Sequence, residues 1–247
     1  MKKFTNFVLA GALTLGMAFT SFVAVAPAGA AGNGPNRNTN TTTTTRPAAR
    51  PVTPTPSPVL SAEEIAGLSF MREEEKLARD VYLNMADLWG AQVFSNIAAS
   101  EQKHMDAIGT LLTRYGIADP AAGNGIGEFS NAELQALYDD LMAMGRQSLT
   151  DALQVGALIE ETDIEDLIHE LSAVKHSDIK RVYTQLEQGS ENHLRAFTSN
   201  LSAQGAAYEP QVLDKDTYGD IASGTNGNRQ GRGNNSMQGQ GDGTCNR

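Results

Sequence analysis

The sequence is poor in cysteine and in the patterns that predict β-strands, and each shortage excludes a class of protein. The only cysteine among the 247 residues is Cys245. A single cysteine excludes an intramolecular disulfide and a metal site built from thiolates. Runs that alternate apolar and polar residues, as half-buried strands do, are nearly absent. The foldable part of the chain is therefore expected to be all-α.

Basic residues are also in short supply. The chain has 19 Lys and Arg against 29 Asp and Glu, which gives a formal net charge of −10. An acidic chain is repelled by the phosphate groups of nucleic acids and by anionic lipid headgroups. Nucleic acid and anionic membranes are therefore not expected to be its main partners.

Residues 1–30 have the composition of a secretory signal peptide. Two lysines precede an apolar run over residues 7–26, and Ala28 and Ala30 fit the small-residue rule for cleavage. Cleavage near Ala30 removes both lysines, takes the net charge from −10 to −12, and leaves no membrane segment. The mature protein is expected to be secreted or associated with the cell envelope. An uncut apolar run is long enough to anchor the chain in a bilayer, and this alternative stays open.

Low-complexity segments flank the middle of the chain. Residues 31–59 are rich in Thr, Pro and Asn and are expected to form a disordered linker. Residues 206–247 end in Gly, Asn and Gln, which bury little, so they are expected to form a flexible tail. The remaining residues, 60–205, suffice for one compact domain.

Apolar residues recur every three or four positions between residues 60 and 205, which predicts helices. Ser61 with Glu64, and Ser130 with Glu133, have the spacing of a capping box at a helix start. The predicted helices cover residues 61–89, 93–115, 130–144, 148–174 and 177–204.

The lengths of the connections predict how the helices are arranged. Short loops join the first two long helices, and likewise the last two, so each pair is expected to form an antiparallel hairpin. About thirty residues, including the short helix, join the two hairpins. This order predicts a ferritin-like four-helix bundle with one long crossover that carries a short extra helix.

Each of the four long helices carries ionisable groups in the stripe where apolar residues are expected. These groups are Glu75 in the first, Glu101 and His104 in the second, Glu160 in the third and His193 in the fourth. All lie near the middle of their helices, so an antiparallel bundle would bring them to one level.

The chemistry of these groups points to metal. A buried carboxylate without a partner costs several kcal/mol, in the range of about 2–7 kcal/mol for a polar group and more for a charge. Divalent cations remove that cost, because carboxylate and imidazole are ligands for iron, manganese and zinc. A Glu-x-x-His pair such as Glu101 and His104 supplies two ligands from one helix to a two-metal site. The alternative is a network of Glu–His hydrogen bonds that only fixes the register of the helices.

Residues 61–205 resemble the ferritin-like superfamily, and specifically its bacterial and archaeal family known as domain of unknown function 2202. The resemblance is carried by residues 72–82, 100–116, 153–167 and 190–197. Glu75, Ala78 and Tyr82 also match the Glu-x-x-Ala-x-x-x-Tyr pattern of rubrerythrin-like first helices. The resemblance implies a centre of two iron or manganese ions, with Glu75, Glu101, His104, Glu160 and His193 at the matching ligand positions.

The sequence departs from the superfamily pattern at one position. The pattern has Glu three residues before the histidine of the fourth helix, and this chain has Ser190. Asp163, one turn after Glu160, is the candidate that would replace the missing carboxylate. One of the two metal ions is therefore expected to be held more tightly than the other.

The resemblance also implies a class of reaction. A pair of carboxylate-bridged metal ions reacts with dioxygen or peroxide, which makes a ferroxidase-like or peroxidase-like oxidoreductase the expected function. The sequence identifies no catalytic side chain beyond the ligands. The alternative function is a non-catalytic helical module of the cell envelope that binds metal or a partner. A homodimer is compatible with either function.

Overall fold

A computed structural model of the protein describes residues 59–224. The described part contains six α-helices and no strand, which confirms the all-α prediction. They are α1 (Ala62–Trp89), α2 (Gln92–Tyr115), α3 (Ala132–Gly145), α4 (Leu149–Ala173), α5 (Ser177–Ala203) and α6 (Lys215–Ala222). No helix in residues 59–224 is both long enough and apolar enough to span a membrane. The predicted signal peptide and nearly all of the predicted linker lie outside the described residues.

Local signals fix where the long helices begin and end. Ser61 and Glu64 form the predicted capping box, each side chain bonded to the backbone N–H of the other. Gly90 and Gly116 end α1 and α2 with φ of 64° and 68°, a left-handed conformation that glycine adopts without steric cost. The capping box predicted at Ser130 is wrong, because the neighbouring Asn131 caps α3 with its side-chain oxygen.

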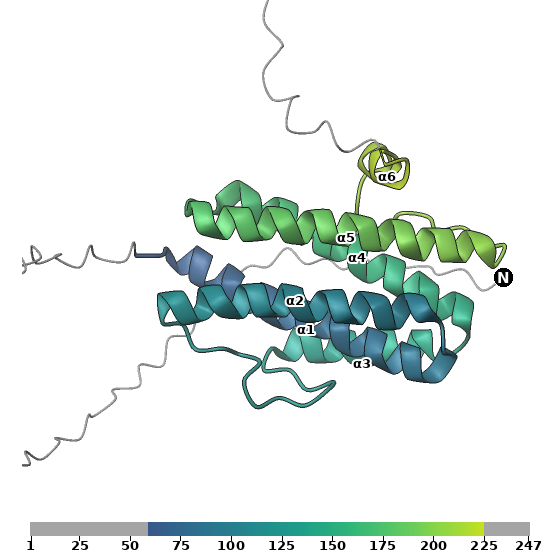
Figure 1. Ribbon diagram of the computed structural model, residues 1–247, viewed down its shortest axis with the longest axis horizontal. Coiled ribbons are helices and arrows are strands. Elements are labelled where there is room, and N and C mark those ends of the chain that lie inside the picture. Colours follow the sequence, from purple (N-terminus) through teal and green to yellow (C-terminus); the bar gives the residue numbers. More distant parts are fainter. Residues whose placement is uncertain (1–58, 225–247) are drawn as a thin grey trace, which may run out of the picture. The chain divides into compact units, whose positions relative to one another are not determined.

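The four long helices pack in pairs (Figure 1). Helix α1 packs along α2, and α4 packs along α5, as the short connections predict. The pairs meet where α1 contacts α4 and α2 contacts α5. The short helix α3 packs against α1 and α4, and α6 packs against α5.

Buried apolar residues form two separate clusters along these helices. One surrounds the rings of Tyr82, Phe94 and Phe197, whose centroids lie 5.1–6.3 Å apart. The other surrounds Leu68 and Ile108. In α1, α2 and α5 the two clusters are separated along the helix by a layer of buried polar residues. The predicted ligands lie in this layer.

The packed domain extends beyond residue 205, where the sequence predicted its end. Tyr208, Leu213 and Ile221 are buried, and the last of these belongs to α6. The carboxylate of Glu161 on α4 accepts hydrogen bonds from the Tyr208 hydroxyl and from the backbone N–H groups of residues 211–213. The prediction of a flexible tail is therefore wrong for residues 206–222, because a buried carboxylate holds this segment against α4.

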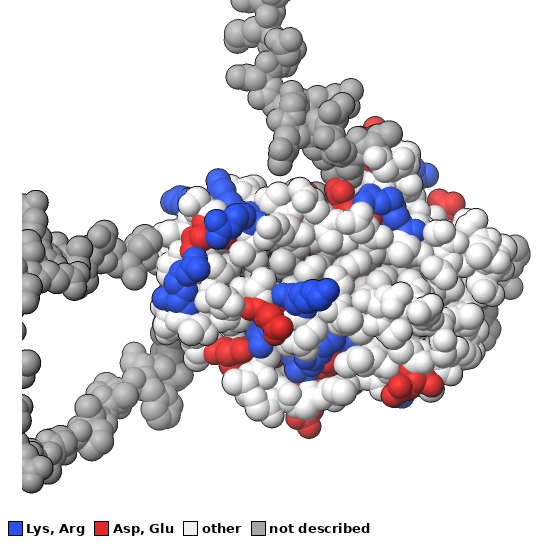
Figure 2. Space-filling view, viewed as in Figure 1, with Lys and Arg blue, Asp and Glu red and all other residues white. Residues whose placement is uncertain are grey.

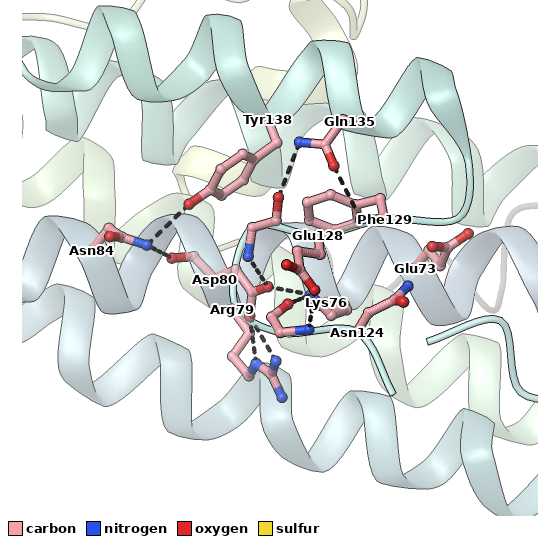
Figure 3. A network of polar contacts seen from close by, with 12 residues as sticks. Glu73, Lys76, Arg79, Asp80, Asn84, Asn124, Glu128, Phe129, Gln135 and Tyr138 are labelled. Atoms are coloured by element: carbon pink, nitrogen blue, oxygen red, sulfur yellow. Dashed lines mark hydrogen bonds and ion pairs between the residues drawn. The ribbon is translucent and has the colours of Figure 1, made fainter. Parts of the chain in front are cut away.

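Ionisable side chains of α1 anchor the long segment between α2 and α3 (Figure 3). Lys76 and Asp80 form a buried ion pair with 2.5 Å between Nζ and Oδ2. Lys76 also donates to the carbonyl of Gly125 at 2.6 Å, and Asp80 accepts from the N–H of Gly127 at 2.9 Å. Glu73 accepts from two backbone N–H groups at the start of α3. These contacts fix the crossover against the same turns of α1 that carry Glu75.

Candidate metal centre

The ionisable groups singled out in the sequence are buried in the polar layer of the domain. Glu75, Glu101 and Glu160 are 1–2 % exposed, although burial removes a charged carboxylate from water and is therefore unfavourable. They come from three different helices, α1, α2 and α4, and lie near the middle of each. Burial of three carboxylates at one level requires either positive charge among them or protonation of some of them.

The first cluster consists of Glu75, Glu101 and His104. One ligand atom from each residue lies within 4.8 Å of the other two. The Nδ1 atom of His104 is 2.7 Å from Oε2 of Glu101 and 3.2 Å from Oε2 of Glu75. The Glu-x-x-His spacing on α2 thus places both side chains on the face that meets α1.

The second cluster consists of Glu101, Glu160 and His193, whose ligand atoms also lie within 4.8 Å of one another. The Nδ1 atom of His193 is 2.7 Å from Oε1 of Glu101 and 3.3 Å from Oε2 of Glu160. The rings of His104 and His193 stack with centroids 5.5 Å apart. Glu101 therefore belongs to both clusters and turns one carboxylate oxygen toward each histidine.

The charges of the layer shift the pKa of its members. Burial disfavours the charged ring of His104, but Glu101 and Glu75 outweigh this effect and raise its pKa to about 11. Burial also lowers the pKa of His193, but the carboxylates of Glu160 and Glu101 outweigh burial and raise this pKa to about 10. For Glu101, burial raises the pKa, yet the two histidines lower it to about 2. Protons and metal ions compete for the same imidazole nitrogens, so metal affinity at these clusters should rise with pH.

Several buried oxygen and nitrogen atoms of the layer have no hydrogen-bond partner. They are Oε1 of Glu75, Oε1 of Glu101, Oδ1 of Asp163 and Nδ1 of His193. Two of them, Nδ1 of His193 and Oε1 of Glu101, lie 2.7 Å apart without the alignment of a hydrogen bond. Ligand atoms that surround a common cation are arranged in this way. A donor set of three carboxylates and two imidazoles suits iron, manganese or zinc, so the residues fit a two-metal centre.

Asp163 and Ser190 lie at the edge of the two clusters rather than within them. Both are buried, and the Ser190 hydroxyl donates to Oδ2 of Asp163. Burial and the charge of Asp163 raise the pKa of Glu75, which places the Asp163 carboxylate near the first cluster. Asp163 belongs to neither three-residue group. Its predicted role as a ligand therefore stays a prediction, although one of its oxygens is free to turn toward a metal ion.

Two contributors to the layer were not assigned a role from the sequence. The Tyr82 hydroxyl donates to Oε1 of Glu160 at 2.6 Å and so orients that carboxylate. Glu74 is buried beside Glu75, with its Oε2 atom unpartnered. Helical periodicity could not indicate Glu74, since adjacent residues point to different faces of a helix. Glu74 and Glu75 are both buried because the crossover segment and α4, in addition to α2, pack against α1.

The described domain is therefore a helical domain with two buried carboxylate–histidine clusters that share Glu101 and could hold metal ions. Comparison with known proteins identifies the family. The chain belongs to the family of the uncharacterized protein domain DUF2202, whose profile matches residues 64–225. This confirms the resemblance to domain of unknown function 2202 drawn from the sequence, whereas the resemblance to the wider ferritin-like superfamily stays a prediction.

Relatives of known sequence or structure support this assignment. The chain is 48% identical over 172 residues to the uncharacterized protein MJ0754 of Methanocaldococcus jannaschii, across 70% of this chain and 93% of that protein. It is also similar to the crystal structure of the hypothetical protein MJ0754 from Methanococcus jannaschii DSM 2661. That match has a TM-score of 0.67 and 48% identity, over 69% of this chain and 98% of the other.

Proposed function

We propose that α1, α2, α4 and α5 form a ferritin-like four-helix bundle that holds two iron or manganese ions and reacts with dioxygen or peroxide. The observation that carries the proposal is Glu101. Its two carboxylate oxygens each lie 2.7 Å from a different histidine, as a ligand that bridges two metal ions would require. A hydrogen-bond network that only fixed the register of the helices would need one Glu–His pair. It would not need two pairs that share one carboxylate.

Each metal ion has its own set of ligands in this proposal. Glu75 and His104 would hold one ion, Glu160 and His193 the other, and Glu101 both. When bound, two adjacent iron or manganese ions supply the redox chemistry by which dioxygen or peroxide is reduced. Asp163 is proposed as a further ligand of the more weakly held ion, in place of the carboxylate that Ser190 lacks.

The remaining residues of the site keep the ligands in position. Apolar clusters on both sides of the polar layer exclude water, which strengthens the electrostatic interactions inside it. The hydroxyl of Tyr82 holds Glu160 in place. Residues 59–224 contain no cysteine that could hold an iron–sulfur centre, so electrons would come from an external donor.

Metal should stabilise the domain, because it compensates buried carboxylates. We expect two ions per chain, and a free energy of unfolding higher by about 2.7 kcal/mol for each bound ion when the metal is present at a hundred times its dissociation constant. The measurement is elemental analysis of purified protein, with thermal unfolding of the metal-free and the Fe(II)- or Mn(II)-loaded forms. Absence of bound metal together with identical melting temperatures would contradict the proposal and favour a hydrogen-bond network.

Turnover separates the oxidoreductase from the non-catalytic module. The metal-loaded protein should consume dioxygen or hydrogen peroxide repeatedly in the presence of Fe(II) or another one-electron donor. Loss of oxidant is measured with an electrode, and the control is the Glu101→Gln variant, which is expected to bind metal weakly at both clusters. A protein that binds two metal ions and consumes no oxidant beyond one equivalent would be a binding module of the cell envelope.

We also propose that the mature protein is secreted or held at the cell envelope. The charged start, the apolar run and the Ala-x-Ala site of residues 1–30 support export. The partners are proposed to be metal ions rather than nucleic acid. On the face of the described residues shown in Figure 2, basic side chains lie among acidic ones and form no continuous basic stripe, which a nucleic-acid interface would need. Mass spectrometry of the native protein should give an N-terminus near Ala31. An intact Met1 in the cytosolic fraction would contradict export.

A further inference from the structure

A row of acidic side chains leads away from the metal centre along α4. Asp163, Asp166 and Glu170 follow the ligand Glu160 at intervals of three, three and four residues, which places all of them on one face of the helix. Their exposure increases with distance from the centre. Asp163 is 5% exposed, whereas the side chain of Glu170 is 23% exposed.

Helix α1 faces this row and adds a fourth carboxyl group. Glu74 is 6% exposed, and burial together with the neighbouring carboxyl groups of Asp166 and Asp163 raises its pKa. Further out, a Cβ atom on Gly67 would lie 2.1 Å from Oε2 of Glu170. The Glu170 carboxylate therefore occupies the space that a side chain at Gly67 would fill, between α1 and α4. The row thus runs through the contact between these two helices.

The row also contains buried oxygen atoms without a partner. Oε2 of Glu74, Oδ1 of Asp163 and the hydroxyl of Tyr183 on α5 make no hydrogen bond. Tyr183 is 1% exposed, and burial together with the charges of Glu170, Glu64 and Glu74 raises the pKa of its hydroxyl. Three buried oxygen atoms from three helices thus lie in or near the acidic row, and none of them makes a hydrogen bond.

Positive side chains do not balance this row. Within residues 59–224, the four acids form no ion pair with lysine or arginine, and Glu170 has only the exposed His169 at 4.0 Å. Carboxylate and hydroxyl oxygens without a resident cation are suitable ligands for a divalent metal ion.

We propose that Glu170, Asp166 and Glu74 form an access path, which ends at the proposed ligand Asp163 and along which divalent metal ions reach the two clusters from the surface. The inference rests on the proposed metal centre. Among the described residues, only the two clusters bring three ligand atoms within 4.8 Å of one another. Each position on the path therefore offers an ion too few ligands to retain it, which suits passage rather than storage.

The rate of metal loading tests the path separately from the centre. Metal-free protein is mixed rapidly with Co(II), whose absorbance reports its binding to histidine and carboxylate. The double variant Asp166→Asn/Glu170→Gln should bind two ions with the parent's final affinity but load them at least about tenfold more slowly, within the range by which charged clefts raise on-rates. The single variants should each show part of this effect.

The control is Glu165→Gln, which removes the same charge from an exposed position on α4. It should load at the parent's rate. If the double variant also loads at that rate, or the control slows equally, the path is wrong. A lower final metal count in the double variant would make these acids ligands and would also overturn the path. A parent protein that binds no Co(II) would instead contradict the proposed metal centre.

Discussion

Replacing Glu101 with glutamine is expected to weaken metal binding at both clusters at once, by more than a hundredfold at each. Loss of a residue that only orients a ligand already costs roughly 10–100-fold in affinity, and Glu101 is itself proposed as a ligand. Its Oε2 and Oε1 atoms lie 2.7 Å from the histidines of the two clusters. Glutamine keeps the shape of the side chain but removes the negative charge that both metal ions would share.

The matched comparison is Glu160→Gln, which changes a ligand of the second cluster only. This variant should lose one metal ion and keep the other. Isothermal titration of the metal-free proteins with Mn(II) gives the number of ions and the affinity for each. Retention of one ion at the parent's affinity in Glu101→Gln would show that Glu101 does not bridge. Equal losses in both variants would show that the two clusters bind metal only as a unit.

The helices could be predicted because their signals are local. Apolar spacing and the Ser61 capping box define α1 within a residue or two of its observed bounds, Ala62–Trp89. The sequence predicts Ser130 as the N-cap of α3, one residue before the observed cap Asn131, because Ser and Asn are both favourable N-cap residues. The packing of residues 206–222 could not be predicted, since it depends on Glu161, about fifty residues earlier in the chain.

The two clusters could also be predicted in outline, because a charged group in an apolar stripe is visible in one helix at a time. Glu75, Glu101, His104, Glu160 and His193 each interrupt such a stripe, and the structure brings all five together. The buried positions Glu74 and Asp80 carry no such signal. Residues 73–78 of α1 are all buried, although consecutive residues point in every direction around a helix. Their burial depends on α2, α4 and the crossover segment together.

The ion pair that anchors the crossover should dominate the stability of the metal-free domain. Asp80→Asn is expected to lower the free energy of unfolding by about 3–5 kcal/mol, because it leaves Lys76 buried without a counter-charge. Asp80 is fully buried, and it also binds the guanidinium of Arg79 at 2.7 Å and the N–H of Gly127 at 2.9 Å. A loss of this size is a large part of the roughly 5–15 kcal/mol by which most domains are stable.

Urea unfolding of the metal-free proteins measures this effect. Without metal, the free energy of unfolding contains no contribution from metal binding. The exposed Asp87 on the same helix provides the control, and Asp87→Asn should change stability by no more than about 0.5 kcal/mol. The double variant Lys76→Met/Asp80→Asn should recover part of the loss, since no charge then remains buried without a partner. Recovery would identify the unpaired lysine as the cause of the instability. An Asp80→Asn variant as stable as Asp87→Asn would show that the charge of Asp80 is not needed to keep Lys76 buried, and that other contacts hold the crossover.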